Sequence, residues 1–244
     1  MTDPIYAVGD IHGHLDQLDR ALDLIATDGG AAAPVVFLGD LVDRGPDSRG
    51  VIDRLMEGLA AGRPWQVLLG NHDAMFARFL RGGVVHDPRI LSRRPWTDPR
   101  LGGLDTLASY GVAAPESTPL SDLFAAAQAA VPTAHLAFLE ARPRLLERGG
   151  LLFVHAGIRP GVSLPAQDPE DLIWIRDPFL TDPRPYPWLV VHGHTALDYP
   201  QHFGNRIDLD GGAGYGRPIH PAVLEGGRCW LLTDHGRVPL LPQG

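Results

Sequence analysis

Short apolar runs alternate with amphipathic segments over the first 81 residues of the chain. The runs IYAV, APVVFLGD and PWQVLLGNHD have the length and apolar content of buried strands. Residues 14–26 and 48–60 repeat apolar positions at helical spacing, with Ser48 expected as the N-cap of the second helix, and AMFARFLR is also predicted to be helical. Strands that alternate with helices predict parallel βαβ units and an α/β fold.

The regular pattern weakens between about residues 82 and 130. Gly, Pro, Arg and Trp are mixed there, and only residues 121–131 are predicted to form a short helix. We expect an insertion that lies beside the functional site, within a single domain that spans residues 1–244. The remaining chain predicts a strand pair that turns at Gly149 and Gly150 and a strand-rich end with a hairpin at residues 225–228.

Composition narrows the classes of function. The chain has 244 residues, 44% of them hydrophobic, enough for one sizeable core. Its net charge of -8 argues against a nucleic-acid-binding protein, whose surface would carry a basic face. All 21 basic residues are Arg, which excludes mechanisms that need a lysine and leaves guanidinium groups for binding phosphate.

Cysteine usage and hydropathy bear on the cellular compartment. The single cysteine, Cys229, permits no intrachain disulfide, and its apolar surroundings predict a buried bystander. The N-terminal residues lack the pattern of a signal peptide, and no apolar run approaches the roughly 18 residues of a membrane span. We therefore expect a cytoplasmic protein with no membrane partner.

Metal-ligating side chains follow five of the predicted strands. A single histidine at a strand end is more often structural, and an aspartate after glycine often forms a turn. Five such segments together indicate a site, because ligands of α/β proteins bind at the carboxyl ends of the strands. Carboxylate, imidazole and amide oxygen are the ligands of borderline divalent metals, and the absence of thiols argues against a closed structural zinc site. The segments are GDIHG with Asp10 and His12, GDLVDRG with Asp40, GNHD with Asn71 and His72, FVHAG with His155, and HGHT with His194.

In this order the five segments resemble the calcineurin-like metallophosphoesterases. They resemble in particular the serine/threonine phosphoprotein phosphatase branch, with its small bacterial and phage members, and they are also similar to the symmetrical diadenosine tetraphosphate hydrolases. The resemblance runs from Ile5 to about Asp210. It implies two packed mixed β-sheets flanked by helices, with a dimetal centre above the strand ends.

The resemblance also implies the cofactors and their ligands. Two divalent metal ions are expected, with manganese as the first choice and iron, zinc, cobalt or nickel as alternatives. The implied ligands are Asp10 and His12 for the first metal, Asp40 for both metals, and Asn71, His155 and His194 for the second.

Four further residues receive catalytic roles from the resemblance. Arg44 would bind the phosphate, and Asp43 would orient His72 as the general acid that protonates the leaving oxygen. Arg176, in DLIWIRDPF, is the candidate for a second phosphate-binding arginine. The alternatives are a surface turn for Arg44 and a structural ion pair for Arg176.

The expected function is metal-dependent hydrolysis of phosphomonoesters, with phosphoserine and phosphothreonine proteins or small phosphoesters as substrates. The alternative is hydrolysis of dinucleoside polyphosphates or other nucleotides. A non-catalytic scaffold is a third hypothesis, which the presence of the complete ligand set with Asp43 and His72 disfavours. Trp65, Trp174 and Trp188 are expected in the core. His14 and His192 flank ligands, and the alternatives for them are support of those ligands or simple packing. For Arg93 and Arg94 the alternatives are contact with an anionic substrate or a solvated loop.

Overall fold

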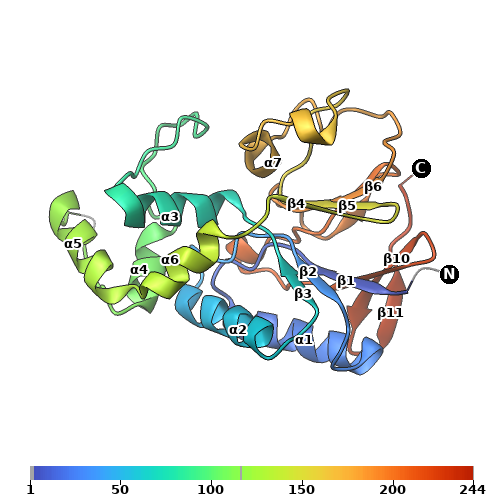
Figure 1. Ribbon diagram of the computed structural model, residues 1–244, viewed down its shortest axis with the longest axis horizontal. Coiled ribbons are helices and arrows are strands. Elements are labelled where there is room, and N and C mark those ends of the chain that lie inside the picture. The colour runs from blue at the N-terminus through green and yellow to red at the C-terminus, as the bar shows by residue number, and fades with distance from the viewer. Residues whose placement is uncertain (1–2, 116, 244) are drawn as a thin grey trace.

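The computed structural model describes residues 3–115 and 117–243, so the ends of the predicted 1–244 domain and Glu116 lie outside the description. Two mixed β-sheets pack face to face (Figure 1). The six-stranded sheet consists, in order across it, of β11 (Gly236–Pro239), β10 (Arg228–Thr233), β9 (Ala222–Glu225), β1 (Ile5–Val8), β2 (Val35–Phe37) and β3 (Trp65–Val67). The five-stranded sheet consists of β4 (Leu145–Arg148), β5 (Leu151–Val154), β6 (Leu189–His192), β8 (Arg206–Asp208) and β7 (Gln201–His202).

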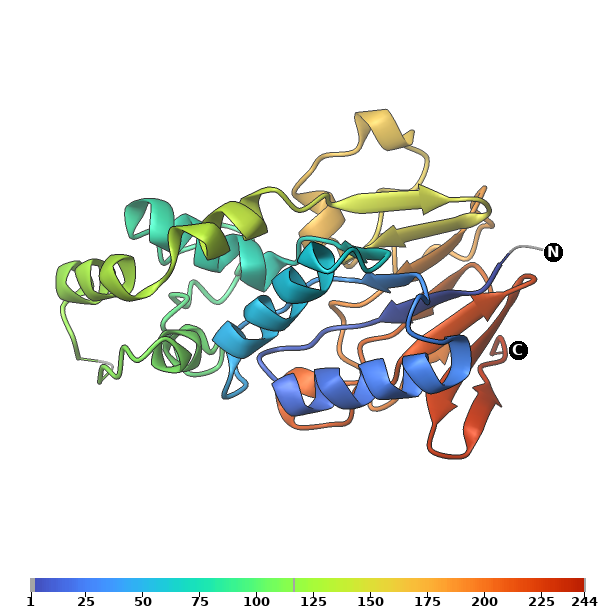
Figure 2. The same ribbon diagram turned by 60° about the horizontal axis from the view of Figure 1, so that its bottom comes forward.

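Alternate side chains of β1 pack against different layers. Tyr6 and Val8 join the core beneath α1 (Leu15–Gly29) and α2 (Ser48–Ala60), the two helices in front of the sheet in Figure 2. Ile5 lies on the opposite face of β1, and the residues of this face pack against side chains of the five-stranded sheet. Because β1 is covered on both faces, its sequence is continuously apolar rather than alternating.

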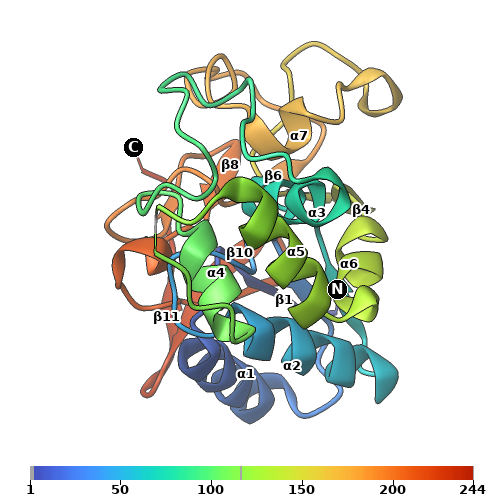
Figure 3. The same cartoon turned by 90° about the vertical axis from the view of Figure 1, so that its left-hand side faces the viewer.

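Four helices gather at one end of the sheets, where Figure 3 shows them in front of the strands. They are α3 (Asn71–Gly82), α4 (Gly103–Ser109), α5 (Leu120–Ala130) and α6 (Thr133–Glu140). The short α7 (Asp171–Trp174) lies over the five-stranded sheet, and the single 3-10 turns are η1 (Leu164–Ala166) and η2 (Ala213–Tyr215). Within the described residues, no helix has the length and apolarity that a membrane crossing requires.

The predicted alternation of strands and helices is confirmed. β1, β2 and β3 pair in parallel, and the strand pair of β4 and β5 turns at Gly149 and Gly150 as expected. The sequence did not predict α4, α6 and α7. These helices have 7, 8 and 4 residues and are therefore too short to show a sustained periodicity.

One predicted cap is wrong. The N-cap of α2 is Asp47, whose Oδ1 accepts a hydrogen bond from the backbone N of Gly50 at 2.7 Å. Ser48 is instead the first helical residue, and its hydroxyl lies 3.0 Å from the Oγ1 of Thr106. The serine side chain bonds across to another helix, which leaves the capping to the preceding carboxylate.

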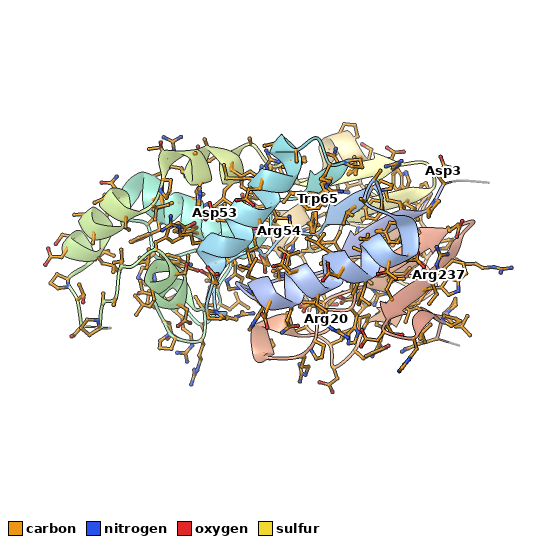
Figure 4. All side chains as sticks on the ribbon, turned by 90° about the horizontal axis from the view of Figure 1, so that it is seen from below. Asp3, Arg20, Asp53, Arg54, Trp65 and Arg237 are labelled. Atoms are coloured by element: carbon orange, nitrogen blue, oxygen red, sulfur yellow. The ribbon has the colours of Figure 1, made fainter. Side chains whose placement is uncertain are left out.

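The expected core position of Trp65 is confirmed. Its indole is buried between α2 and the sheet, and the guanidinium of Arg54 lies 5.7 Å from the ring centroid (Figure 4). A Cβ at Gly58 of α2 would lie 1.8 Å from this indole, so the glycine permits the close approach of the helix.

Candidate metal centre

All six predicted metal ligands lie in one buried cluster at the carboxyl ends of strands from both sheets. Asp10 and His12 follow β1, Asp40 follows β2, Asn71 begins α3 after β3, His155 follows β5 and His194 follows β6. The parallel strands of each sheet end at the same edge, and face-to-face packing brings the two edges together.

The glycines of the motifs allow neighbouring strand ends to approach. A Cβ at Gly70 would lie 2.1 Å from the Oδ1 of Asp40, and a Cβ at Gly193 would lie 2.1 Å from the Oδ1 of Asp10. Real side chains do not tolerate such distances. The glycines before Asn71 and His194 are therefore required by ligands of other strands.

The backbone of the cluster adopts a conformation that is rare for residues with a side chain. Six non-glycine residues of the described chain have a positive φ, and five of them are predicted site residues: His12, Asp40, Asp43, Arg44 and His194. Left-handed turns at strand ends are costly outside glycine and cluster at functional sites. Here they turn the side chains inward from the ends of the strands.

Asp40 lies at the centre of the cluster. Its Oδ2 is 3.7 Å from the Nε2 of His12, and its Oδ1 is 3.4 Å from the Nε2 of His155. Two groups of potential metal ligands result, one of Asp40 with His12 and His72 and the other of Asp40 with His155 and His194. Asp40 alone belongs to both groups among the described residues.

Asp10 belongs to neither group. Its Oδ2 lies 3.9 Å from the Nε2 of His12, and its Oδ1 accepts a hydrogen bond from the backbone N of His194 at 3.1 Å. Asp10 is thus at the edge of the cluster, and its role as a ligand stays a prediction.

Backbone carbonyls fix two of the imidazole rings. The Nδ1 of His12 donates to the O of Val42 at 2.9 Å, and the Nδ1 of His155 donates to the O of Leu38 at 3.0 Å. A carbonyl oxygen can only accept, so it selects the tautomer in which Nε2 carries the lone pair. The Nε2 atoms of both rings face Asp40 and are left to bind a proton or a metal ion.

Acceptor atoms face one another around the group of Asp40, His155 and His194. The Oδ1 of Asn71 lies 3.0 Å from the Nε2 of His155 and 2.8 Å from the Nδ1 of His194. The Nε2 of His194 is buried without a hydrogen-bond partner among the described residues. Imidazole, amide and carboxylate acceptors that face one another suit a divalent cation between them, so the residues present fit the implied metals.

The charges of the cluster favour a cation as well. Burial lowers the pKa of His155, but the carboxylates of Asp40 and Asp10 outweigh it and raise this pKa to about 9. Burial raises the pKa of Asp40, but His155 and His72 hold it well below its usual range. A buried carboxylate that stays ionised requires positive charge beside it.

The predicted acid pair is in contact. The Nδ1 of His72 lies 2.6 Å from the Oδ2 of Asp43, and both side chains are buried. Arg44 donates to the Nε2 of His72 at 3.1 Å and to the Nε2 of His12 at 3.0 Å. Its guanidinium therefore lies at the cluster and not in a solvated turn.

Two residues that the sequence analysis missed hold Asp43. The indole Nε1 of Trp96 donates to Oδ2 at 2.8 Å, and the hydroxyl of Thr106 donates to Oδ1 at 2.7 Å. Both come from the segment with the weak pattern, and no spacing signal could have paired them with Asp43. Asp210 was also missed, although NRIDLDGG ends a strand in a carboxylate as the recognised motifs do.

A cavity of about 700 Å³ opens onto the cluster. Four arginines line it: Arg44, Arg89, Arg176 and Arg217. The side chain of Arg176 is exposed and makes no ion pair or hydrogen bond with the residues that the structure describes, so a structural ion pair is not what holds it there. Trp174 lines the cavity and is only half buried, which corrects the expectation of a core residue.

The remaining unassigned residues lie outside the cavity. Arg94 pairs with Asp98 at 2.8 Å, and neither it nor Arg93 lines the cavity. His192 is fully buried behind the cluster, with its Nδ1 3.0 Å from the O of Gly193, and burial lowers its pKa to about 3. His192 and Arg94 therefore make structural contacts, whereas Arg93 is exposed.

The fold and the cluster of potential metal ligands can be compared with known families. The family model of the calcineurin-like phosphoesterases matches residues 3–215. The chain therefore belongs to the calcineurin-like phosphoesterase family, which confirms the predicted family and fold. Metal-dependent ester hydrolysis is the chemistry that the family resemblance implies, and the arrangement of ligands agrees with it.

Named relatives refine the comparison. The chain is 31% identical over 157 residues to the symmetrical bis(5'-nucleosyl)-tetraphosphatase of Ralstonia nicotianae, covering 64% of this chain and 43% of that protein. It is 26% identical over 235 residues to the asymmetrical bis(5'-nucleosyl)-tetraphosphatase PrpE of Bacillus subtilis, covering 87% of each. The chain thus spans less than half the length of the symmetrical relative.

Solved structures share the fold. A protein described as a candidate diadenosine tetraphosphatase superposes with a TM-score of 0.67 at 24% identity, covering 99% of this chain and 95% of that chain. A cold-active protein tyrosine phosphatase superposes with a TM-score of 0.64 at 17% identity, covering 99% of this chain and 80% of that chain. At these identities the likeness concerns the fold alone.

Proposed function

We propose that this chain is a dimetal-dependent phosphoesterase whose substrates are dinucleoside polyphosphates. The observation that carries the proposal is the cavity beside the cluster, where four guanidinium groups meet apolar and aromatic side chains. A single phosphomonoester offers one anionic group, whereas a polyphosphate offers several in a row for separate arginines. The names of the relatives from Ralstonia nicotianae and Bacillus subtilis support the same substrate class. Phosphoprotein hydrolysis, the first expectation from the sequence, has less support.

Two divalent ions complete the proposed site. The residues that would hold them are those predicted from the sequence, and Asp40 would contribute to both groups because its oxygens face His12 and His155 separately. When bound, such a pair lowers the pKa of water and polarises phosphoryl oxygens. Manganese remains the first choice among metals that accept this ligand set.

The chain's own residues bind the substrate and move a proton. Arg44 donates to a non-bridging phosphate oxygen, for which its planar fork is suited. Arg176 is free to bind a neighbouring phosphate. His72, once protonated on both nitrogens, would give the proton on Nε2 to the leaving oxygen, and Asp43 orients the ring by accepting the Nδ1–H at 2.6 Å.

The cavity walls have a proposed role in binding the nucleosides. The residues meant are those that line the cavity outside the cluster, among them Arg89, Leu91, Tyr215 and Arg217. Tyr215 is 65% exposed, and its ring centroid lies 5.2 Å from the guanidinium carbon of Arg44. An exposed aromatic ring beside a phosphate-binding arginine is suited to stack on a base.

Phosphomonoester hydrolysis is the second candidate, and the pair of His72 and Asp43 favours it. General acid help matters in proportion to the basicity of the leaving group. A serine alkoxide needs a proton to leave, whereas a nucleoside phosphate leaves readily without one. A buried acid pair is thus more useful on a phosphomonoester of an alcohol.

A side-by-side assay with Mn²⁺ tests the proposal. The substrates are diadenosine tetraphosphate, a phosphoserine peptide and p-nitrophenyl phosphate, and chromatography follows the products. We expect kcat/KM to be highest for the dinucleotide, by about tenfold or more, which corresponds to about 1.4 kcal/mol. A higher value for the phosphopeptide would overturn the proposal in favour of the second candidate. The products also separate symmetrical from asymmetrical cleavage.

We further propose that residues 1–244 form one catalytic domain with the insertion of residues 82–130 beside the site. The shared core of the two sheets supports this, since Ile5 and Val36 of one sheet pack with Phe153 of the other. The contacts of Trp96 and Thr106 with Asp43 support the placement of the insertion.

A further inference from the structure

We propose that Trp96 and Thr106, which the insertion contributes, are positioning residues that act on the proposed acid His72 through Asp43. The inference rests on the phosphoester hydrolysis of the proposed function. It gives the insertion a part in the chemistry, in addition to forming a wall of the cavity.

Asp43 has no exposed surface, and its carboxylate is held on both oxygens. Oδ2 accepts from the Nδ1 of His72 at 2.6 Å and from the indole of Trp96 at 2.8 Å. Oδ1 accepts from the hydroxyl of Thr106 at 2.7 Å. A buried carboxylate needs such donors, and here two of the three come from the insertion.

The protons of these bonds can be assigned without ambiguity. A carboxylate only accepts, so the single hydroxyl proton of Thr106 points to Asp43. The Oγ1 of Thr106 then accepts from the backbone N of Asp43 at 2.8 Å and from the hydroxyl of Ser48 at 3.0 Å. Thr106 thus binds both the backbone and the side chain of Asp43, which fixes the carboxylate relative to its own turn.

Trp96 links the two halves of the acid pair. Its ring is fully buried and lies 5.6 Å from the ring of Phe76 and 4.8 Å from the ring of Phe79, both on the helix α3 that carries His72. The same indole donates to Asp43. The Trp96 side chain therefore fixes the position of the Asp43 carboxylate relative to α3, the helix that carries His72.

The insertion also contacts the backbone of the turn that carries Asp43 and Arg44. The O of Gly102 accepts from the backbone N of Arg44 at 3.4 Å. Gly102 has a φ of 86°, and a Cβ there would lie 2.2 Å from that nitrogen. The insertion thus stabilises the turn at Asp43 and Arg44. Such support is needed because a positive φ is costly and both residues have one.

The test replaces the donors with minimal changes in shape. Trp96→Phe removes the indole N–H, Thr106→Val removes the hydroxyl, and Thr106→Ser restores it. The matched control is Tyr110→Phe, which removes a buried hydroxyl of the same insertion that bonds to the Nδ1 of His135 at 2.8 Å, away from Asp43. Each protein is assayed with Mn²⁺ on phenyl phosphate and p-nitrophenyl phosphate, with elemental analysis for bound metal.

We expect Trp96→Phe and Thr106→Val to lower kcat for the phenyl ester by about tenfold and for the nitrophenyl ester by less than about threefold, because only the poorer leaving group depends on the acid. KM and metal content stay near wild type, and Thr106→Ser recovers most of the loss. The control lowers Tm without changing the ratio of the two esters. As a second readout, the downfield proton NMR signal of the His72 Nδ1–H, identified by its loss in His72→Asn, shifts in Trp96→Phe.

Two results would overturn the role. Equal losses on both esters, or an unchanged ratio and an unmoved proton signal in folded variants, would make these bonds purely structural. If Trp96→Phe does not fold, the comparison of Thr106→Val with Thr106→Ser is the test of the role. A wild-type chain that hydrolyses neither ester nor the dinucleotide overturns the proposed function and this role with it, whereas an active wild type with an unchanged ratio overturns only the role.

Discussion

The strand-end cluster and the walls of the cavity are held by different forces. In the cluster, buried imidazoles are fixed by carbonyls of the packed sheet, as in the bonds of His12 and His155. On the walls, ion pairs hold the arginines. Arg217 pairs with Asp198, whose side chain is 91% exposed. Arg89 pairs with the exposed Asp168 and also with the buried Asp171 at 2.9 Å. Exposed pairs contribute only about 0–1 kcal/mol each.

This difference indicates that the cluster and the walls serve different functions, the first in the chemistry and the second in the choice of substrate. The cluster cannot change without disturbing two sheets, so the chemistry is tied to the fold. The walls lie on loops that tolerate substitution, so substrate choice can change there at little cost in stability. We expect substitutions in the cluster to affect all substrates and substitutions in the walls to discriminate among them.

The largest effect is expected from Asp40→Asn. Because its two oxygens face the two groups of ligands, the variant should hold less of both metals. Its kcat/KM should fall by more than the roughly 10- to 100-fold that loss of a supporting partner costs. Elemental analysis and kinetics measure both quantities. Asp198→Asn, the same change of charge on the wall, should keep its metals. Two tightly bound ions in Asp40→Asn would contradict the comparison.

His72→Asn should show a loss that depends on the leaving group. We expect at least a roughly 100-fold lower kcat on a phosphoserine peptide and a much smaller loss on p-nitrophenyl phosphate, which leaves without a proton. Metal content should be unchanged, and Asp43→Asn should repeat the pattern more mildly. His86→Asn, at an exposed histidine of the insertion that does not line the cavity, is the control. Loss of metal would instead make His72 a ligand.

Arg44→Ala tests the residue between the two regions, since it contacts His12 and lines the cavity. Losing its charged hydrogen bonds costs about 1.5–3 kcal/mol in transition-state binding, or roughly 10- to 150-fold in kcat/KM. Both KM and kcat should change while the metals remain. Arg94→Ala removes an arginine outside the cavity and should have wild-type kinetics. Unaltered kinetics in Arg44→Ala would place the phosphate elsewhere.

The smallest effect, and the most selective, is expected from Tyr215→Ala. If the exposed ring stacks on a base, KM for diadenosine tetraphosphate should rise about tenfold, because such stacking contributes about 1–3 kcal/mol. KM for p-nitrophenyl phosphate should stay the same. Tyr215→Phe keeps the ring and should behave as wild type. Equal changes in KM for both substrates would contradict the expectation that the cavity walls, unlike the cluster, discriminate among substrates.

The ligand cluster could be predicted because each of its members carries a local signal. Asp40 and Asn71 each follow an apolar strand and a glycine, and parallel strands bring such positions to one edge. The supports of Asp43 carry no such signal. Trp96 and Thr106 are 53 and 63 residues away from it along the chain, in a region without periodicity. The hydroxyl of Ser48 was likewise assigned to a cap, since its partner on another helix was not visible from the sequence.

By itself, the sequence determined the α/β alternation, the order of the ligand motifs, the family and the reliance on arginine, because these are properties of neighbouring residues. Tertiary structure decided which acceptors face one another, that Arg44 reaches both His12 and His72, and that Trp174 lines a cavity. These features depend on how two sheets and an insertion pack together. Packing is set by long-range contacts that the spacing of residues along a chain does not encode.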